Sequence, residues 1–132
     1  MPWLWLVAAA RHYPVVLDLG CGSGLCARVV RGLAGVIDGV DLSGAMVEQA
    51  QATGLYRRVA HEDLLPFLQG STEPVDLVMA ADVFIYVGAL EAVFAAVRRR
   101  LRAGGQFAFS VERHDGAQDL QLLHSMRYAH AP

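Results

Sequence analysis

Residues 15–24 read VVLDLGCGSG, a run of strand formers followed by glycine at every second position: Gly20, Gly22 and Gly24. The next stretch, residues 25–33, has a helix-forming composition. A strand, a tight glycine turn and a helix start form a layout that brings bare backbone close to a nucleotide-like ligand. We therefore expect a ligand site at this turn, and the glycine spacing bears on which ligand it is.

Strand-like and helix-like segments alternate along the chain, and most of the strand-like segments are apolar throughout. Such runs are typical of parallel strands covered on both faces. The expected strands are Val15–Leu19, Val36–Val40, Tyr56–Ala60, Val75–Ala80 and Gln106–Val111, and the expected helices are residues 3–12, Gly24–Leu33, Gly44–Thr53 and Leu90–Leu101. This order predicts an α/β fold with a parallel sheet and right-handed crossovers. The ligand is expected at the carboxyl ends of the strands, at the switch point next to the first strand.

Two local patterns predict which side chains face the core and which strand lies at the edge. Leu25, Val29 and Leu33 recur at helical spacing, so we expect them on one face of the first helix after the glycine turn. Arg57 and Arg58 interrupt the third strand, which indicates an edge position in the sheet.

The later segments are less regular. Residues 64–69 contain Pro66 and are expected to hold at most one turn of helix. The arginines within residues 98–102 fall at the end of a helix, where cations complement the carbonyl end of the helix dipole. Residues 120–129 are ambiguous between a short helix and a strand.

Composition favours a single domain over residues 1–132, with a core at 14–112 and a tail at 113–132. The net charge of −2 argues against a nucleic-acid partner, and no apolar run is long enough to cross a membrane. Cys21 and Cys26 are interpreted as two small reduced residues, and a cytoplasmic location is expected.

The glycine spacing argues against a dinucleotide ligand. The dinucleotide fingerprint needs glycine at the first, third and sixth positions of the turn, and the sixth position counted from Gly20 is Leu25. Asp41 follows Gly20 by 21 residues and closes the second strand, where a carboxylate can accept both hydroxyls of a ribose. The competing interpretation is that Asp41 pairs with Ser43 at the start of the next helix.

The ends of the third and fourth strands carry further ligand chemistry. The segment His61-Glu62-Asp63-Leu64 places an acid where it can accept from an adenine amino group. The segment Ala80-Ala81-Asp82 has small residues that leave room for a bound group. Residues that could bind a ligand thus follow several parallel strands, whose carboxyl ends lie at the same edge of the sheet. This arrangement predicts one shared site.

These segments together resemble the class I S-adenosylmethionine-dependent methyltransferases. The resemblance rests on VLDLGCGSG, GVDLS, HEDL, DLVMAADVFIYV and LRAGGQFAFSVE, in that order, and covers about residues 14–112. FSVE and the later RYAHA are also similar to a bacterial group of small-molecule-type methyltransferases found with tetratricopeptide repeats. The resemblance implies a Rossmann-like three-layer sandwich with a mostly parallel sheet in the order 3-2-1-4-5.

The same resemblance implies S-adenosylmethionine as the cofactor. The residues that would bind it are Asp18, Gly20, Cys21, Gly22, Asp41, Leu42, Met46, Asp63, Leu64 and Ala81. The turn backbone would pass beside the methionine portion and Asp18 would hold its ammonium group, while Asp41 would accept from the ribose. An alternative for the buried Asp18 is an acceptor that stabilises the turn by binding loop amides.

The remaining residues of this set would surround the adenine and the sulfur. By the resemblance, Leu42 and Met46 would cover the adenine, Asp63 would meet its amino group and Leu64 its face. Ala81 would lie near the sulfonium.

The expected reaction is an in-line displacement at the sulfonium methyl, which needs orientation but no nucleophilic residue. A general base helps only if the acceptor must lose a proton, and Asp82 and Tyr86 are candidates. A cap or loop role for Asp82 and a packing role for Tyr86 compete with this interpretation. The histidines show no metal-ligand spacing, so no metal is expected.

The chain departs from the family at its C-terminal side, where the last two strands of the family sheet are expected to be missing. The edge of the fifth strand, with Phe107, Phe109 and Val111, would then be covered by the tail, by a second copy or by a missing segment. The acceptor is expected to be a small molecule or a protein side chain. Two other functions remain open, a cofactor-binding remnant without turnover and a dinucleotide-binding oxidoreductase domain.

Overall fold

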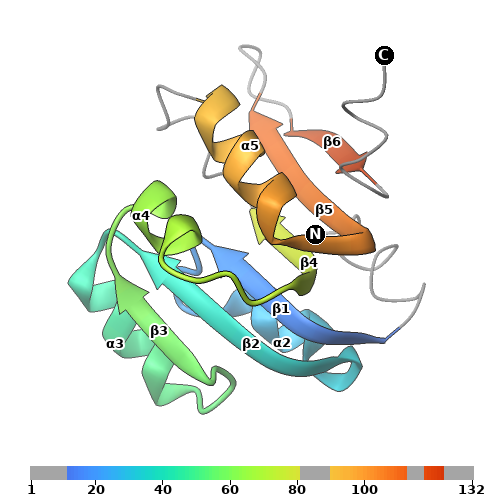
Figure 1. The fold of residues 1–132 in the computed structure, drawn as a ribbon. Helices are drawn as coiled ribbons and strands as arrows, with labels where there is room; N and C mark the ends of the chain where they lie inside the picture. Colours follow the sequence, from blue (N-terminus) through green and yellow to red (C-terminus); the bar gives the residue numbers. More distant parts are fainter. Residues whose placement is uncertain (1–11, 81–89, 113–117, 124–132) are drawn as a thin grey trace.

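The computed structural model describes residues 12–80, 90–112 and 118–123. Six strands form one sheet in the order β3-β2-β1-β4-β5-β6 (Figure 1). Their bounds are β1 Tyr13–Leu19, β2 Ala34–Asp41, β3 Arg58–His61, β4 Val75–Ala80, β5 Leu101–Glu112 and β6 Gln118–Leu123. The first five strands pair in parallel, which confirms the predicted order 3-2-1-4-5. The charged strand β3 lies at one edge, as Arg57 and Arg58 predicted.

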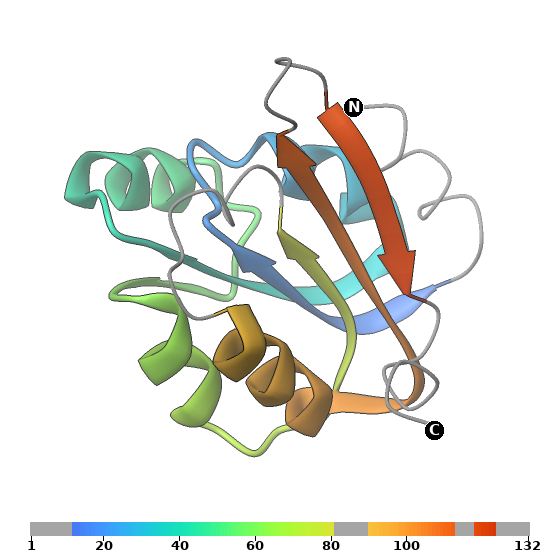
Figure 2. The same cartoon turned by 90° about the horizontal axis from the view of Figure 1, so that it is seen from above.

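The described helices lie on both faces of the sheet and complete the three layers that were expected (Figure 2). Their bounds are α2 Leu25–Val30, α3 Gly44–Ala52, α4 Leu64–Gln69 and α5 Leu90–Arg100, and a short 3-10 helix, η1, covers Arg31–Leu33. On the α4 and α5 face, the core includes Leu17 and Leu19 of β1. On the α2 face it includes Val16 and Met79. Alternate residues of β1 therefore face opposite layers, as in a strand buried on both sides.

The prediction for the buried face of α2 is wrong. Leu25 is 56% exposed and Val29 is 42% exposed, whereas Cys26, Ala27 and Val30 are buried. Leu25 and Val29 form one apolar series with a spacing of four residues, and Cys26 and Val30 form another. Periodicity alone therefore does not select the buried face in a helix of six residues. The glycine turn that leads into α2 fixes the rotation of the helix and turns its small side chains inward.

Helix α4 is longer than the single turn that was expected. Asp63 is its N-cap, and the Asp63 side chain accepts a hydrogen bond from the Leu64 backbone N–H. Pro66 is then the third residue of the helix, in the first turn, where backbone N–H groups lack acceptors within the helix. Proline is therefore tolerated at this position.

Strand β5 follows α5 directly and contains an irregular segment. Val75 of β4 pairs with Leu101, and two residues later Leu77 pairs with Gln106. Residues 102–105 are looped out between these pairs, and Gly104 has a positive φ of 80°. Residues Ala103, Gly104 and Gly105 form most of this loop.

The last two strands of the family sheet were expected to be missing, but the described residues include one strand after the fifth. Strand β6 pairs antiparallel with β5, from Phe107 opposite Leu123 to Glu112 opposite Gln118. The C-terminal tail therefore covers the edge of β5, which was one of the three expected coverings. Residues 118–123 lack the regular alternation of a strand, so the pairing follows from the open edge of β5 more than from their own pattern.

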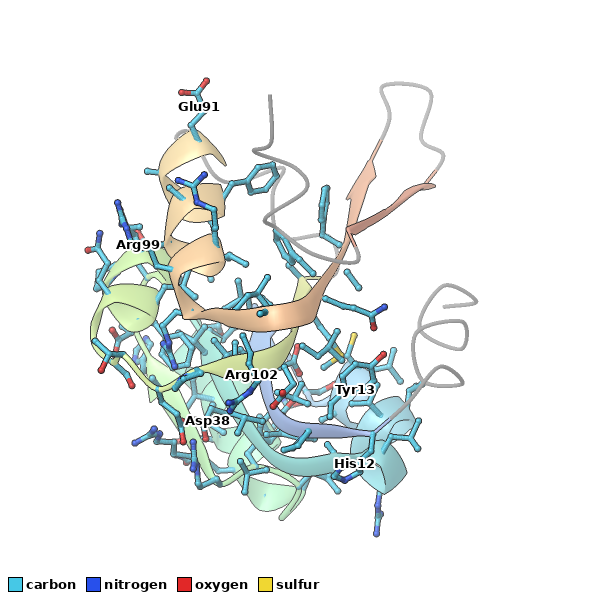
Figure 3. All side chains as sticks on the ribbon, turned by 45° about the vertical axis from the view of Figure 1, so that its right-hand side comes forward. His12, Tyr13, Asp38, Glu91, Arg99 and Arg102 are labelled. Atoms are coloured by element: carbon cyan, nitrogen blue, oxygen red, sulfur yellow. The ribbon has the colours of Figure 1, made fainter. Side chains whose placement is uncertain are left out.

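Two of the arginines around the end of α5, Arg100 and Arg102, bind other parts of the chain. Arg100 is 4% exposed and donates to the carbonyls of Glu73 and Leu68 over 2.9 and 3.1 Å. Arg102 forms an ion pair with Asp76 at 3.1 Å. Arg99 projects away from the sheet (Figure 3). Arg100 thus fixes the connection between α4 and β4, a role that the predicted interaction with the helix dipole did not include.

A buried carboxylate joins β2 to the β3 edge. Asp38 is 1% exposed and accepts from Arg57 through both oxygens, at 3.0 and 2.7 Å. Arg58 adds a third bond at 3.2 Å, and Arg57 also pairs with Glu73 at 2.7 Å. A buried ion pair of this kind is costly to break because the remaining charge stays desolvated.

We expect Arg57→Met to lower the free energy of unfolding by about 2–4 kcal/mol, since Asp38 then keeps only Arg58 as its partner. Denaturation in urea measures this change. The control is Arg98→Met, on an exposed part of α5, which should change stability by less than about 0.5 kcal/mol. Equal losses in the two variants would contradict the assigned role of Arg57.

Candidate functional site

The glycine turn between β1 and α2 has the backbone that its sequence predicts. Gly20, Gly22 and Gly24 have φ values of 66°, 54° and 97°, which a residue with a side chain rarely adopts. A Cβ at Gly22 would meet no atom within 4 Å, so this part of the turn borders open space. The Cys21 backbone N–H donates to the Val40 carbonyl over 2.9 Å and joins the turn to β2.

Asp41 at the end of β2 binds this turn directly. Its Oδ2 accepts from the Gly22 backbone N–H at 3.0 Å, and its Oδ1 accepts from the Ser43 backbone N–H at 2.8 Å. The pairing with Ser43 that was weighed as an alternative is therefore present together with the contact to the turn. A carboxylate has about four lone-pair positions, so about two remain for other donors.

The residues after Asp41 form the start of α3. The Ser43 hydroxyl accepts from the Met46 backbone N–H at 3.3 Å, which makes Ser43 the N-cap of α3. Leu42 is 65% exposed and Met46 is half-buried. An apolar side chain is thus exposed next to a carboxylate that has acceptor positions free.

Asp18 lies in β1 beneath the glycine turn. It is 2% exposed, and the Tyr56 hydroxyl donates to its Oδ2 over 2.7 Å. The Tyr56 ring occupies the space next to two glycines: a Cβ at Gly39 would lie 2.8 Å from the ring and one at Gly24 would lie 3.5 Å from it. Sequence reasoning missed Tyr56, although a glycine inside β2 is a signal that something packs closely against the strand.

Burial dominates the electrostatics around Asp18. Burial raises the pKa of Asp18 to about 7, the hydrogen bond from Tyr56 lowers it, and the charge of Asp41 raises it further. Burial also raises the pKa of the Cys21 thiol to about 12, with the charges of Asp18 and Asp41 adding to the effect. The pKa of Tyr56 is raised well above its usual range, first by burial and then by Asp18. Cys21 and Tyr56 keep their protons near neutral pH, so ionised Asp18 is the group of these three whose charge would stabilise a nearby cation.

The end of β3 contributes one exposed acid. Asp63 is exposed and caps α4, whereas Leu64 is 5% exposed and belongs to the core. The His61 Nε2 lies 2.9 Å from the Leu42 carbonyl oxygen, so the ends of β2 and β3 are joined there. The burial of Leu64 argues against the expected contact of its side chain with an adenine face.

Three predicted residues, Ala81, Asp82 and Tyr86, lie outside the described residues. In the described ranges, no group of three or more His, Cys, Asp or Glu side chains could hold a metal ion. Over the same part of the chain, no helix has the length and apolarity needed to cross a bilayer.

A separate cavity of about 340 Å³ lies between α4 and the sheet. Its lining includes Asp38, Arg58, Glu62 and Arg100. Asp38 is paired with Arg58, and Arg100 is bound to carbonyls, so much of this charge is already satisfied. The cavity does not include the glycine turn or Asp41.

The sequence model of the family described as "Methyltransferase domain" matches residues 16–105, more than half of the chain. The chain belongs to this methyltransferase domain family. The matched residues include the glycine turn and Asp41, so the geometry described above is that of the domain's central part.

Curated proteins similar to this methyltransferase domain are considerably longer than it is. Ribosomal protein L11 methyltransferase of Cupriavidus necator is 36% identical over 107 residues, which cover 80% of this chain and 34% of that protein. Human methyltransferase-like protein 27 is 39% identical over 74 residues, which cover 52% of this chain and 30% of that protein. The domain thus spans about a third of the length of each.

Solved structures share the fold. An S-adenosylmethionine-dependent methyltransferase from Clostridium acetobutylicum matches with a TM-score of 0.70 and 27% identity, covering 82% of this domain and 46% of that chain. The N-methyltransferase NodS from Bradyrhizobium japonicum, solved in complex with S-adenosyl-L-homocysteine, matches with a TM-score of 0.71 and 19% identity, covering 83% and 58%. At 19% identity the second match shows the fold alone.

Proposed function

We propose that this chain is the cofactor-binding part of an S-adenosylmethionine-dependent methyltransferase. The observation that carries the proposal is the contact between the Gly22 backbone N–H and the Asp41 carboxylate. It joins the glycine turn of β1 to the acid of β2 at the carboxyl ends of the parallel strands, where ligands bind in sheets of this kind. The family and the solved neighbours support the choice of cofactor.

The described residues fit the chemistry of this cofactor. Asp41 has acceptor positions for the two ribose hydroxyls, and the exposed Leu42 and the half-buried Met46 can cover an adenine ring. Asp63 is the acceptor for the adenine amino group. The backbone from Gly20 to Gly22, including Cys21, passes beside the methionine portion.

The residues of this chain bind and orient, and the bound cofactor supplies the reactive methyl group on its sulfonium. Asp18 lies in β1 two residues before Gly20, and its carboxylate, once ionised, would attract the ammonium group of the cofactor. We retain Ala81 as a neighbour of the sulfur, and Asp82 and Tyr86 as candidates for the base where an acceptor must lose a proton.

The acceptor is proposed as a small molecule or a protein side chain. The similar proteins include an O-methyltransferase of ubiquinone biosynthesis and a ribosomal protein methyltransferase, which is consistent with both classes. A cytoplasmic location is part of the proposal, because a secreted chain with a disulfide framework would hold more than the two cysteines of this sequence.

Calorimetric titration with S-adenosylhomocysteine and with NAD tests the proposal. We expect saturable binding of S-adenosylhomocysteine at one site and no saturable binding of NAD. The third glycine of the dinucleotide fingerprint is absent from this turn, since Leu25 occupies the sixth position. Binding of NAD with indifference to S-adenosylhomocysteine would instead support the oxidoreductase alternative.

A further inference from the structure

We propose that Tyr56 is a positioning residue of the cofactor site, which acts by holding Asp18 so that binding of the cofactor's ammonium group releases a proton from Asp18. The inference rests on the proposed cofactor. It assigns a role to a residue that lies outside the glycine turn and precedes β3.

The position of Tyr56 is fixed from both sides along the chain. The Arg57 backbone N–H donates to the Ile37 carbonyl over 2.7 Å, and the Leu55 backbone N–H donates to the Thr53 hydroxyl over 3.2 Å. Between these anchors the Tyr56 ring lies against the Cα of Gly39, where a Cβ would come within 2.8 Å of it. A ring held in this way presents its hydroxyl to Asp18 at a set distance of 2.7 Å.

Among the described residues, the groups that surround Asp18 come from several neighbouring elements. They are Cys21 of the turn, Asp41 of β2 and Tyr56, with Cys26 of α2 also acting on Tyr56. The residues beside Asp18 on the adjacent strands β2 and β4 are Gly39 and Met79, which carry no charge. Each titratable group in this set is neutral or negative, so no cation within the set balances an ionised Asp18.

Tyr56 and a bound cation act on Asp18 in the same direction. Burial raises the pKa of Asp18 to about 7, and the Tyr56 hydroxyl keeps the pKa from rising further. An opposite charge within about 4–6 Å lowers a carboxyl pKa by about 1–3 units. When the ammonium group binds, the Asp18 O–H bond breaks, the proton goes to the buffer and the ammonium keeps its own protons.

The pH dependence of binding follows from this proton release. Between pH 5.5 and pH 7.0, we expect the affinity for S-adenosylhomocysteine to rise about tenfold. The reason is that Asp18 is protonated in a smaller fraction of the ligand-free molecules at the higher pH. This range lies below the pKa of about 7.7–8.0 of an α-amino group, so the ligand stays an ammonium ion. The comparison ligand is 5′-methylthioadenosine, which has the same nucleoside and sulfur but no ammonium group, and its affinity should not change.

Tyr56→Phe and Tyr13→Phe form a matched pair of variants. Both remove a tyrosine hydroxyl that is hydrogen-bonded inside the protein, Tyr13 to Gln106 and Tyr56 to Asp18. Without its donor, Asp18 has a higher pKa, so Tyr56→Phe should weaken binding of S-adenosylhomocysteine at pH 7.0 by about 3–10-fold. Tyr13→Phe should keep the wild-type affinity and pH profile, even if it loses a similar amount of stability.

Calorimetry at pH 7.0 in phosphate and in Tris counts the protons released. We expect about half a proton per S-adenosylhomocysteine for the wild type, nearly one for Tyr56→Phe and none for Asp18→Asn. Carbon NMR of the Asp18 carboxyl in the ligand-free protein should show a midpoint near pH 7 that moves upward only in Tyr56→Phe.

Binding without proton release, or equal effects of the two tyrosine variants, would overturn the inference and leave the proposed function intact. Absence of S-adenosylhomocysteine binding at every pH would overturn both.

Discussion

Replacement of Asp41 by alanine is expected to weaken S-adenosylhomocysteine binding by at least about 100-fold while the fold is retained. Hydrogen bonds to a charged group contribute about 1.5–3 kcal/mol each, and this variant loses the acceptor for two ribose hydroxyls. It also loses the bond from the Gly22 backbone N–H, so the turn is held less firmly. Calorimetry measures the affinity, and circular dichroism checks the fold.

Asp76→Ala is a matched control for Asp41→Ala. Asp76 is also half-buried and accepts from a backbone N–H, that of Val15, at 2.9 Å. It is the second residue of β4, at the opposite end of the strands from the glycine turn. Its loss should reduce stability by about 1–3 kcal/mol without changing cofactor affinity. Unchanged affinity in Asp41→Ala would show that the ribose assignment is wrong.

The second large effect is expected in the pH dependence of stability. In the folded protein burial raises the pKa of Asp18 from 3.8 to about 7. Between these values the folded state keeps a proton that the unfolded chain releases, so the contribution of Asp18 to stability decreases as pH rises from about 4 to 7. At about 1.36 kcal/mol per pKa unit, the contribution of Asp18 to stability decreases by on the order of 4 kcal/mol.

Asp18→Asn has no proton to lose and isolates this effect. From pH 4 to pH 8, the difference in unfolding free energy between wild type and Asp18→Asn should shift by about 3–4 kcal/mol in favour of the variant. Urea denaturation at each pH measures the difference. The unfolding free energy of Tyr13→Phe, which retains Asp18, should change with pH in the same way as that of the wild type. A difference that stays constant with pH would mean that Asp18 is ionised throughout.

The parallel strands and the glycine turn could be predicted from the sequence because both depend on local composition, whereas the strand order was implied by the resemblance to the methyltransferases. The continuous apolar runs predicted parallel strands, and the spacing of Gly20, Gly22 and Gly24 predicted a tight turn, in which the three glycines have positive φ values. Asp41 could be predicted because its distance from Gly20 along the chain is set by one crossover between two parallel strands.

The partner of Asp18 could not be predicted in this way. Tyr56 is separated from Asp18 by 38 residues, and their contact depends on how the segment before β3 packs over Gly39. The interactions of Arg100 are also tertiary: a run of arginines at a helix end does not show which one turns into the core. Local patterns predict elements, whereas these contacts follow from the packing of elements that are distant in sequence.

The rotation of α2 and the pairing of β6 were missed for related reasons. The exposed Leu25 and Val29 and the buried Cys26 and Val30 form equally apolar series, and only the turn before them distinguishes the two. Strand β6 has a weak pattern of its own and is defined by its partner, β5. Short segments of this kind take their structure from their neighbours.

A crystal structure grown with saturating S-adenosylhomocysteine tests the central claim most directly. The ligand should place its ribose hydroxyls within hydrogen-bond distance of Asp41 and its amino-acid portion beside the backbone of Gly20–Gly22. A ligand bound elsewhere, for example in the cavity between α4 and the sheet, or a glycine turn left empty at saturation, would contradict the claim.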